Sequence, residues 1–205
     1  MEYQFYDEPL GQEPDINEKY SVSPYKKSKG LTHLMKLVLC TKNNDKCIEM
    51  IKEIIGGNPD KINEQCDEGW TPLMIACRNS STCSSTELVK LLLSYSNIDI
   101  NKQNNEKWTS LMLACRCSNT SSNIETVKLL LDRPDIDVNK QNNEGLTSLS
   151  IACLNSCTDS NIGTVELLLN RPDIDINKDD NEGWTPLMFA DIVIQIPISK
   201  LSNCC

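Results

Sequence analysis

Short apolar blocks alternate with polar turns along the chain, and the blocks return at a fixed interval. The pattern Trp-Thr-Pro-Leu-Met-Ile-Ala-Cys at 70–77 recurs, with changes, from positions 108, 146 and 184. Its threonines stand 38 residues apart throughout, and a weaker copy begins at residue 30. A second apolar block follows each of the first four copies, at 48–55, 88–93, 127–131 and 165–169. The chain is therefore built from repeats.

Each repeat predicts two short helices and a turn. Thr71 suits the N-cap, and Pro72 suits the first helical position, where its missing N–H costs nothing. Leu73, Ala76 and Cys77 then fall on one helical face, and the second block has the same spacing. One pair of such helices cannot bury both faces alone, so we expect the pairs to stack around a continuous core.

These units resemble ankyrin repeats. The family signature T-P-L-H-x-A is matched at 71–76 and 185–190 except at its histidine, and the VKLLL segments at 89–93 and 127–131 also fit. The resemblance covers residues 30–205 and implies an all-α ankyrin-repeat solenoid of helix-turn-helix units. The unit boundaries that it implies are 30–68, 69–106, 107–144, 145–182 and an incomplete 183–205. The Ser-, Thr- and Asn-rich composition also resembles ankyrin families of giant viruses that infect protists.

The units are longer than usual for that family, whose period is about 33 residues. Most of the extra residues lie between the two helices, at 79–85, 117–123 and 155–161, where we expect extended, protruding loops. Methionine or serine replaces the signature histidine, which predicts less rigid units.

One turn position is expected to adopt a left-handed backbone conformation. Gly69, Gly145 and Gly183 occupy it in three units, whereas Lys107 stands there in the third unit. A side chain in that conformation costs about 1 kcal/mol, so we expect strain at Lys107.

The two ends differ from the middle of the chain. Residues 1–29 carry prolines and mixed charge without apolar periodicity, which predicts a flexible tail. In the last unit Pro197 stands where a second helix should begin. Three outcomes stay open for this end: it frays, it packs as an irregular cap, or it marks a truncated longer protein.

Charge and cysteine usage limit the compartment and the partners. There are 29 acidic and 20 basic residues, a net charge of −9, which disfavours nucleic acids and anionic membranes. No apolar run reaches the roughly 18 residues of a membrane span, and the first residues do not form a secretory signal. The eleven cysteines are therefore expected to be reduced thiols. We predict a soluble, monomeric, cytoplasmic protein, in the host cytoplasm if its origin is viral.

The sequence predicts no enzyme and no cofactor. His33 is the only histidine, which excludes histidine triads, and no phosphate-binding glycine loop is present. Asp-x-Asp pairs recur with the repeat, which indicates turn chemistry. Cysteines at one repeat position are expected to act as small core residues; these are Cys77, Cys115 and Cys153. A three-thiolate metal site in the inserted loops stays as a minor alternative; its members would be Cys83, Cys117 and Cys157.

The turn tips and first helices form the candidate binding surface, because the resemblance implies a concave face there that holds partner proteins. Aromatic residues precede the signature threonine, and a glutamate stands two residues before each of them. Such a strip suits a partner protein with basic and apolar groups. The candidate residues are Glu68, Trp70, Arg78, Asn79, Glu106, Trp108, Arg116, Glu144, Leu146, Asn155, Glu182 and Trp184. The alternative is that the tryptophans pack as scaffold between neighbouring turns.

Three functional hypotheses follow. The first is a non-enzymatic adaptor that binds another protein. The second is a targeting fragment of a larger multidomain protein or enzyme. The third is a degenerate repeat copy without a dedicated partner.

Overall fold

The computed structural model describes residues 30–40, 45–79, 86–117, 121–155 and 159–195. Within these ranges the chain forms α-helices, one 3-10 helix and turns, and no strand. The predicted all-α class is therefore confirmed. The predicted tail, residues 1–29, and the region around Pro197 lie outside the described residues, so both interpretations stay predictions.

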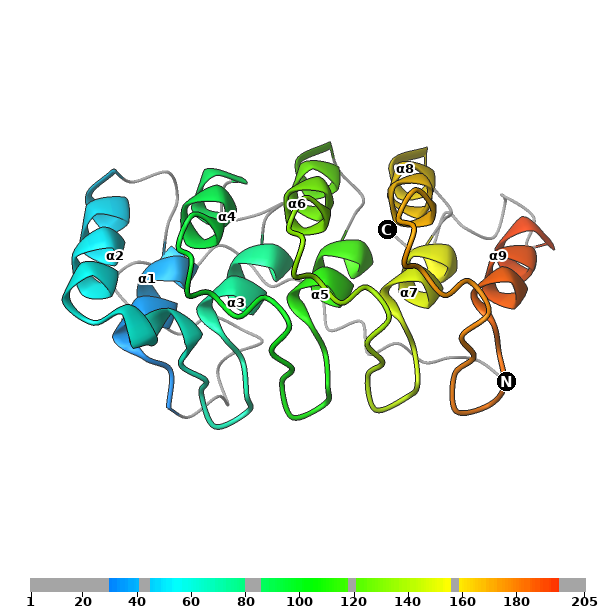
Figure 1. Cartoon of the computed structure of the whole chain (residues 1–205), viewed down its shortest axis with the longest axis horizontal. Helices are drawn as coiled ribbons and strands as arrows, with labels where there is room; N and C mark the ends of the chain where they lie inside the picture. The colour runs from blue at the N-terminus through cyan, green and yellow to red at the C-terminus, as the bar shows by residue number, and fades with distance from the viewer. Residues whose placement is uncertain (1–29, 41–44, 80–85, 118–120, 156–158, 196–205) are drawn as a thin grey trace.

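The helices form two parallel rows, as Figure 1 shows. The row of first helices comprises α1 (His33–Cys40), α3 (Pro72–Arg78), α5 (Ser110–Arg116), α7 (Ser148–Leu154) and α9 (Pro186–Gln195). The row of second helices comprises α2 (Asp45–Gly57), α4 (Thr86–Leu93), α6 (Ser121–Leu131) and α8 (Asp159–Leu169), and the 3-10 helix η2 (Pro59–Asn63) follows α2. Each first helix packs on the next first helix, as α3 does on α5, and α4 and α6 do the same in the second row. The chain is thus a solenoid.

The first helices begin where the repeat predicts. Thr71 is the N-cap of α3, and its Oγ1 accepts a hydrogen bond from the backbone N–H of Met74 at 3.2 Å. Thr109 and Thr147 cap α5 and α7 in the same way. These bonds satisfy an N–H that the helix itself leaves unpaired.

The core lies between the stacked units, and the first helices are its centre. In α5 every residue from Ser110 to Cys115 is buried. Met74 and Met112, which replace the family's histidine, are completely buried and fill the space with apolar atoms. In the fourth unit the hydroxyl of Ser150 lies 3.0 Å from the Oγ1 of Thr147.

The second helices correct one expectation about the inserted loops. Residues 121–123 and 159–161, predicted as loop, belong to α6 and α8. In α6 the half-buried Ile124 continues the apolar spacing of the helix one turn before Val127. The remaining inserted residues, 80–85, 118–120 and 156–158, lie outside the described part.

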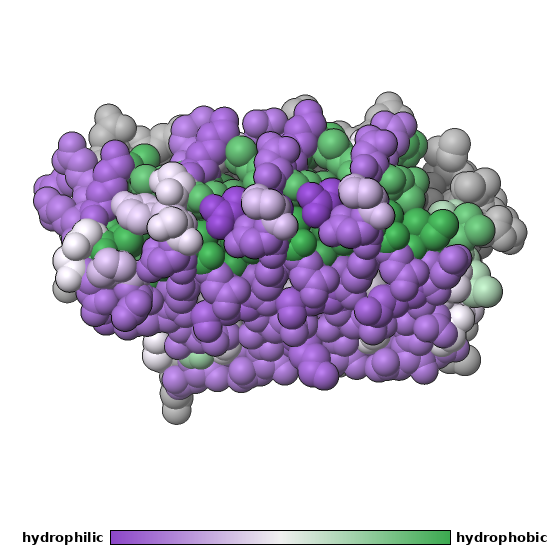
Figure 2. All heavy atoms as spheres, in the orientation of Figure 1, coloured by the Kyte–Doolittle hydropathy of each residue, from purple (hydrophilic) through white to green (hydrophobic). Residues whose placement is uncertain are grey.

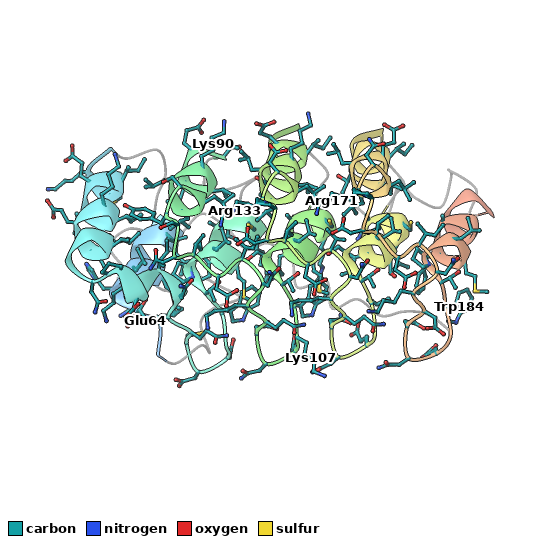
Figure 3. All side chains as sticks on the ribbon, viewed as in Figure 1. Glu64, Lys90, Lys107, Arg133, Arg171 and Trp184 are labelled. Carbon is teal, nitrogen blue, oxygen red and sulfur yellow. The ribbon has the colours of Figure 1, made fainter. Side chains whose placement is uncertain are left out.

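Two arginines, each just after the second helix of its own unit, bind the end of the second helix in the preceding unit. Arg133 donates from Nε and Nη2 to the carboxylate of Asp135, and from Nη1 to the carbonyl oxygen of Leu93, the last residue of α4. Arg171 repeats this with Asp173 and Leu131, and both arginines lie between the helix rows in Figure 3. A cation that binds a free carbonyl at a helix C-terminus stabilises that end. Hydrogen bonding to the guanidinium lowers the pKa of Asp135.

Lys107 has the predicted left-handed backbone, with a φ of 61° beside 80°, 83° and 84° for the three glycines at its repeat position. We expect Lys107→Gly to raise the free energy of unfolding by about 0.5–1 kcal/mol, because relief of strain exceeds the added freedom of the unfolded chain. Urea unfolding measures this change. Lys140→Gly is the matched control: it lies at an ordinary backbone position and should destabilise. A stability loss in both variants would show that Lys107 is not strained.

Candidate interaction surface

The turns before α3, α5, α7 and α9 form narrow fingers, which comprise residues 65–70, 103–108, 141–146 and 179–184 and project beyond the helices (Figure 1). In each of the last three fingers one side chain accepts hydrogen bonds from backbone N–H groups of the same finger, whereas Cys66 stands at that position in the first finger. In the finger at 103–108 Asn104 Oδ1 accepts hydrogen bonds from the backbone N–H groups of Glu106 (3.1 Å) and Trp108 (2.8 Å). Asn142 and Asp180 close the next two fingers in the same way. These three tips therefore have a fixed shape.

Neighbouring fingers are joined to one another by backbone and amide groups. The backbone N–H of Asn105 donates to the carbonyl oxygen of Glu68 at 3.1 Å, and its Nδ2 donates to that of Asp67 at 2.9 Å. Gln65 Nε2 donates both to Gly69 within its own finger (2.7 Å) and to the carbonyl oxygen of Gln103 in the next (3.0 Å). The same bonds recur 38 residues later.

A second set of asparagines joins the bases of the fingers. Asn101 Nδ2 donates to the carbonyl oxygen of Asp135 at 2.6 Å, and Asn101 Oδ1 accepts from the backbone N–H of Asp137 at 2.8 Å. Asn63 and Asn139 make the corresponding bonds to the turns that follow them. Hydrogen bonds therefore hold neighbouring fingers side by side, both at their tips and in the turns that lead into them.

The glutamates at the tips form a row on this scaffold. Glu106, Glu144 and Glu182 are exposed, and Glu68 is half-buried. Because their backbone groups take part in the bonds within and between fingers, the stacking of the units sets the spacing of the backbone positions from which these glutamates project. The surface over the fingers is hydrophilic on the face shown in Figure 2.

The tryptophans lie beneath this row. Trp70 is 9% exposed and Trp108 is 8% exposed, and Leu146 in the same row is completely buried. This burial favours the interpretation of these three side chains as scaffold. Trp184, in the last finger, is half-buried and stacks on Phe189 with ring centroids 5.8 Å apart.

The remaining candidates lie at the ends of the first helices. Arg78 and Arg116 place their guanidinium groups 5.4 and 5.5 Å from the ring centroids of Trp70 and Trp108, within cation–π range. Asn79 is buried at the C-cap of α3, and Asn155, half-buried at the C-cap of α7, donates from Nδ2 to the carbonyl oxygen of Ile151. The structure thus brings arginines and tryptophans together, while the asparagines end helices.

The cysteines at the repeat position behave as core residues. Cys77, Cys115 and Cys153 are buried and form no disulfide. Burial raises the pKa of the Cys77 and Cys115 thiols far above the ordinary 9.0 and that of Cys153 to about 11.

We expect the stability of the protein to decline as the pH rises from about 9 towards 11. The unfolded chain loses thiol protons near their ordinary pKa while the folded chain keeps them, so the folded state binds more protons and alkali favours unfolding. Urea midpoints at about pH 8 and pH 10 measure this decline. Cys77→Ala/Cys115→Ala should flatten it, and an unchanged slope in that variant would contradict the assignment.

In the part of the chain that the structure describes, no group of three histidine, cysteine or carboxylate side chains could hold a metal ion. Cys83 and Cys157 of the proposed thiolate site lie outside it. No helix among the described residues is long and apolar enough to span a bilayer.

A comparison with protein families agrees with this architecture. The family model described as Ankyrin repeats (3 copies) matches residues 37–142 and 117–192. These matches cover well over half of the chain, so it belongs to the ankyrin-repeat family. A comparison with curated proteins finds no match. Nothing in these findings supports the resemblance to giant-virus families.

The sequence alone did not reveal the residues that join neighbouring units. These are Asn63, Asn101, Asn139, Gln65, Gln103 and Gln141, together with Arg133 and Arg171 at the exits of the units. Their recurrence at the 38-residue period was visible, but only the structure shows that their side chains cross from one unit to the next.

Proposed function

We propose that this protein is a non-enzymatic interaction module that binds a partner protein through the fingers and the adjoining first helices. The observation that carries the proposal is the row of glutamates at finger tips that hydrogen bonds hold side by side. Most ankyrin-repeat domains serve in protein–protein interaction, and a surface of this kind suits that role. The partner we infer carries lysine or arginine beside apolar groups.

The physical support is preorganisation together with charge. The backbone that carries the glutamates is held by hydrogen bonds, so a partner has to order only their side chains, which lowers the entropic cost of association. Complementary charge speeds encounter and rejects acidic competitors. Glu106, Glu144 and Glu182 supply that charge, and the half-buried Trp184 offers apolar area beside it. Among the described residues Cys47, Cys66, Cys77, Cys115, Cys117 and Cys153 form no disulfide, which fits a reducing compartment such as the cytoplasm.

The test is comparative affinity enrichment from the native cell type. We expect Glu106→Gln/Glu144→Gln/Glu182→Gln to recover the partner about tenfold less well, since three exposed ion pairs are worth about 0.5 kcal/mol each. The matched control removes three exposed glutamates from the second helices, with Glu49→Gln/Glu87→Gln/Glu166→Gln, and should bind as the wild type does.

Each other result discriminates between the hypotheses. If the finger-tip variant recovered as much partner as the control variant does, the glutamates of the fingers would not be part of the interface. A specific partner that is lost from the control variant would place the interface on the second helices. The absence of a specific partner for the wild type would favour a degenerate repeat copy.

A further inference from the structure

Arginine and tryptophan lie together at the ends of two neighbouring first helices. Arg78, the last residue of α3, places its guanidinium over the ring of Trp70. Arg116, the last residue of α5, does the same over the ring of Trp108. Both arginines are half-buried. Contact with an aromatic ring restricts the motion of a guanidinium, so part of the entropic cost of holding a ligand is removed in advance.

The pairing of tryptophan with arginine is confined to two adjacent units of the repeat. The units on either side have leucine at both repeat positions, and the last unit keeps the tryptophan but has isoleucine in place of the arginine. The residues concerned are Leu31 and Leu39 before the pairs, Leu146 and Leu154 after them, and Trp184 with Ile192 at the end. A cationic pair limited to two units indicates a local site, because a general scaffold feature would recur in all of them.

Arg78 and Arg116 lie on the same side of the stack. Their helices α3 and α5 pack on each other, and packed helices lie about 8–10 Å apart. Burial raises the pKa of the Cys117 thiol at the C-cap of α5, while the positive charges of both arginines oppose that rise, so both lie near this one thiol. Leu154, half-buried at the end of α7, comes next in the same row. The row therefore presents two cations followed by an apolar side chain.

We propose that Arg78 and Arg116 bind an extended acidic segment of the partner protein, in which two carboxylates stand three residues apart. A guanidinium can hold a carboxylate through two parallel N–H···O bonds. Three residues of extended chain span about 10 Å, which matches the spacing of neighbouring first helices. Leu154 then lies opposite a residue three positions further along, which we expect to be apolar. The inference rests on the proposed function, because it assigns a second contact to the same partner.

The net charge of −9 is compatible with an acidic ligand at this place. Salt at 0.15 M screens exposed charges beyond about 8 Å, so the two nearby guanidinium groups outweigh the distant carboxylates of the protein. A partner with acidic residues opposite the arginines and basic residues opposite the finger-tip glutamates would be held in one orientation.

NMR titration of the full-length, isotope-labelled protein with a synthetic peptide tests the inference. The peptide is acetyl-Leu-Ser-Ser-Glu-Ser-Ser-Glu-Ser-Ser-Leu-amide, in which a leucine on each side serves either chain direction. We expect it to shift the side-chain Nε–H signals of Arg78 and Arg116 and the indole N–H signals of their two tryptophans. The chain has four arginines, and the other two, Arg133 and Arg171, are internal controls that should not shift because they already bind aspartates.

Variants separate an oriented guanidinium pair from plain positive charge. Arg116→Lys keeps the charge but loses the two-pronged geometry, so it should weaken peptide binding about tenfold. Lys128→Gln removes a cation from the exposed face of α6 and should bind the peptide as the wild type does. A second peptide with its two glutamates adjacent can reach only one guanidinium and should bind about tenfold more weakly than the first.

Three results would overturn the inference. They are unmoved signals of Arg78 and Arg116, equal shifts of all four arginines, and equal binding of the two peptides. The peptides make no contact with the finger-tip glutamates, so each of these results would overturn the acidic contact alone. The enrichment experiment with the finger-tip variant decides the proposed function separately.

Discussion

Replacing Leu111 with alanine is expected to lower the free energy of unfolding by about 2–5 kcal/mol. Leu111 is completely buried in α5, which packs on α3, α6 and α7, so its loss leaves a cavity shared by three units. Urea unfolding followed by far-ultraviolet circular dichroism measures the change.

Leu111→Met is the matched control, since it conserves volume and should cost less than about 1.5 kcal/mol. A small effect of Leu111→Ala would mean that the units are loosely stacked, and the picture of one continuous core would then fail.

Gly145→Ala is expected to cost about 2–3 kcal/mol, from backbone strain together with weakened hydrogen bonds between fingers. Gly145 has a φ of 83°, and an added Cβ would lie 2.5 Å from the backbone nitrogen of Asn181. That nitrogen donates to the carbonyl oxygen of Glu144 at 3.1 Å. The same unfolding measurement applies.

Gly183 offers the matched control for this substitution. It has nearly the same φ, 84°, but nothing lies within 4 Å of its Cβ position. Gly183→Ala should therefore cost only the strain, about 1–2 kcal/mol. Equal losses in the two variants would show that contact between fingers contributes nothing to stability.

Lys107 shows what adjustment a Cβ at this position requires. Beside Lys107, the hydrogen bond from Asn143 Nδ2 to the carbonyl oxygen of Asn105 is 3.3 Å long. The corresponding hydrogen bonds beside Gly69 and Gly145, donated by Asn105 Nδ2 and Asn181 Nδ2, are 2.9 and 2.7 Å long. The backbone hydrogen bond between the same two fingers, from Asn143 N–H to the carbonyl oxygen of Glu106, is 3.0 Å and no longer than the corresponding 3.1 Å bonds, so the adjustment is confined to the side-chain amide.

The fold could be predicted from the sequence because every local signal agreed with the period. Thr71, Thr109 and Thr147 marked the helix starts, and the spacing of apolar residues marked the buried faces. The left-handed backbone conformation of Lys107 was predicted from the glycines at the same repeat position in other units. Such consistency across levels is what allows a sequence to specify one structure.

The candidate surface was harder to predict, because burial depends on the neighbouring unit. From sequence alone, a tryptophan beside a turn fits two roles equally well: an exposed residue that anchors a partner, and a buried residue that packs between neighbouring turns. Trp108 is buried, whereas Trp184, which has no described finger after it, is half-buried. The exposed glutamates of the same strip remain its accessible part.

The central claim is that a partner binds the row of fingers, and site-specific photo-cross-linking tests it most directly. A benzophenone amino acid would replace Glu106 at a finger tip in one variant and Glu166 on the exposed face of α8 in the other. After irradiation in the native cell type, we predict one specific protein cross-linked from position 106, through a segment rich in lysine or arginine, and none from position 166. Cross-linking from position 166 alone, or none from either position, would contradict the claim.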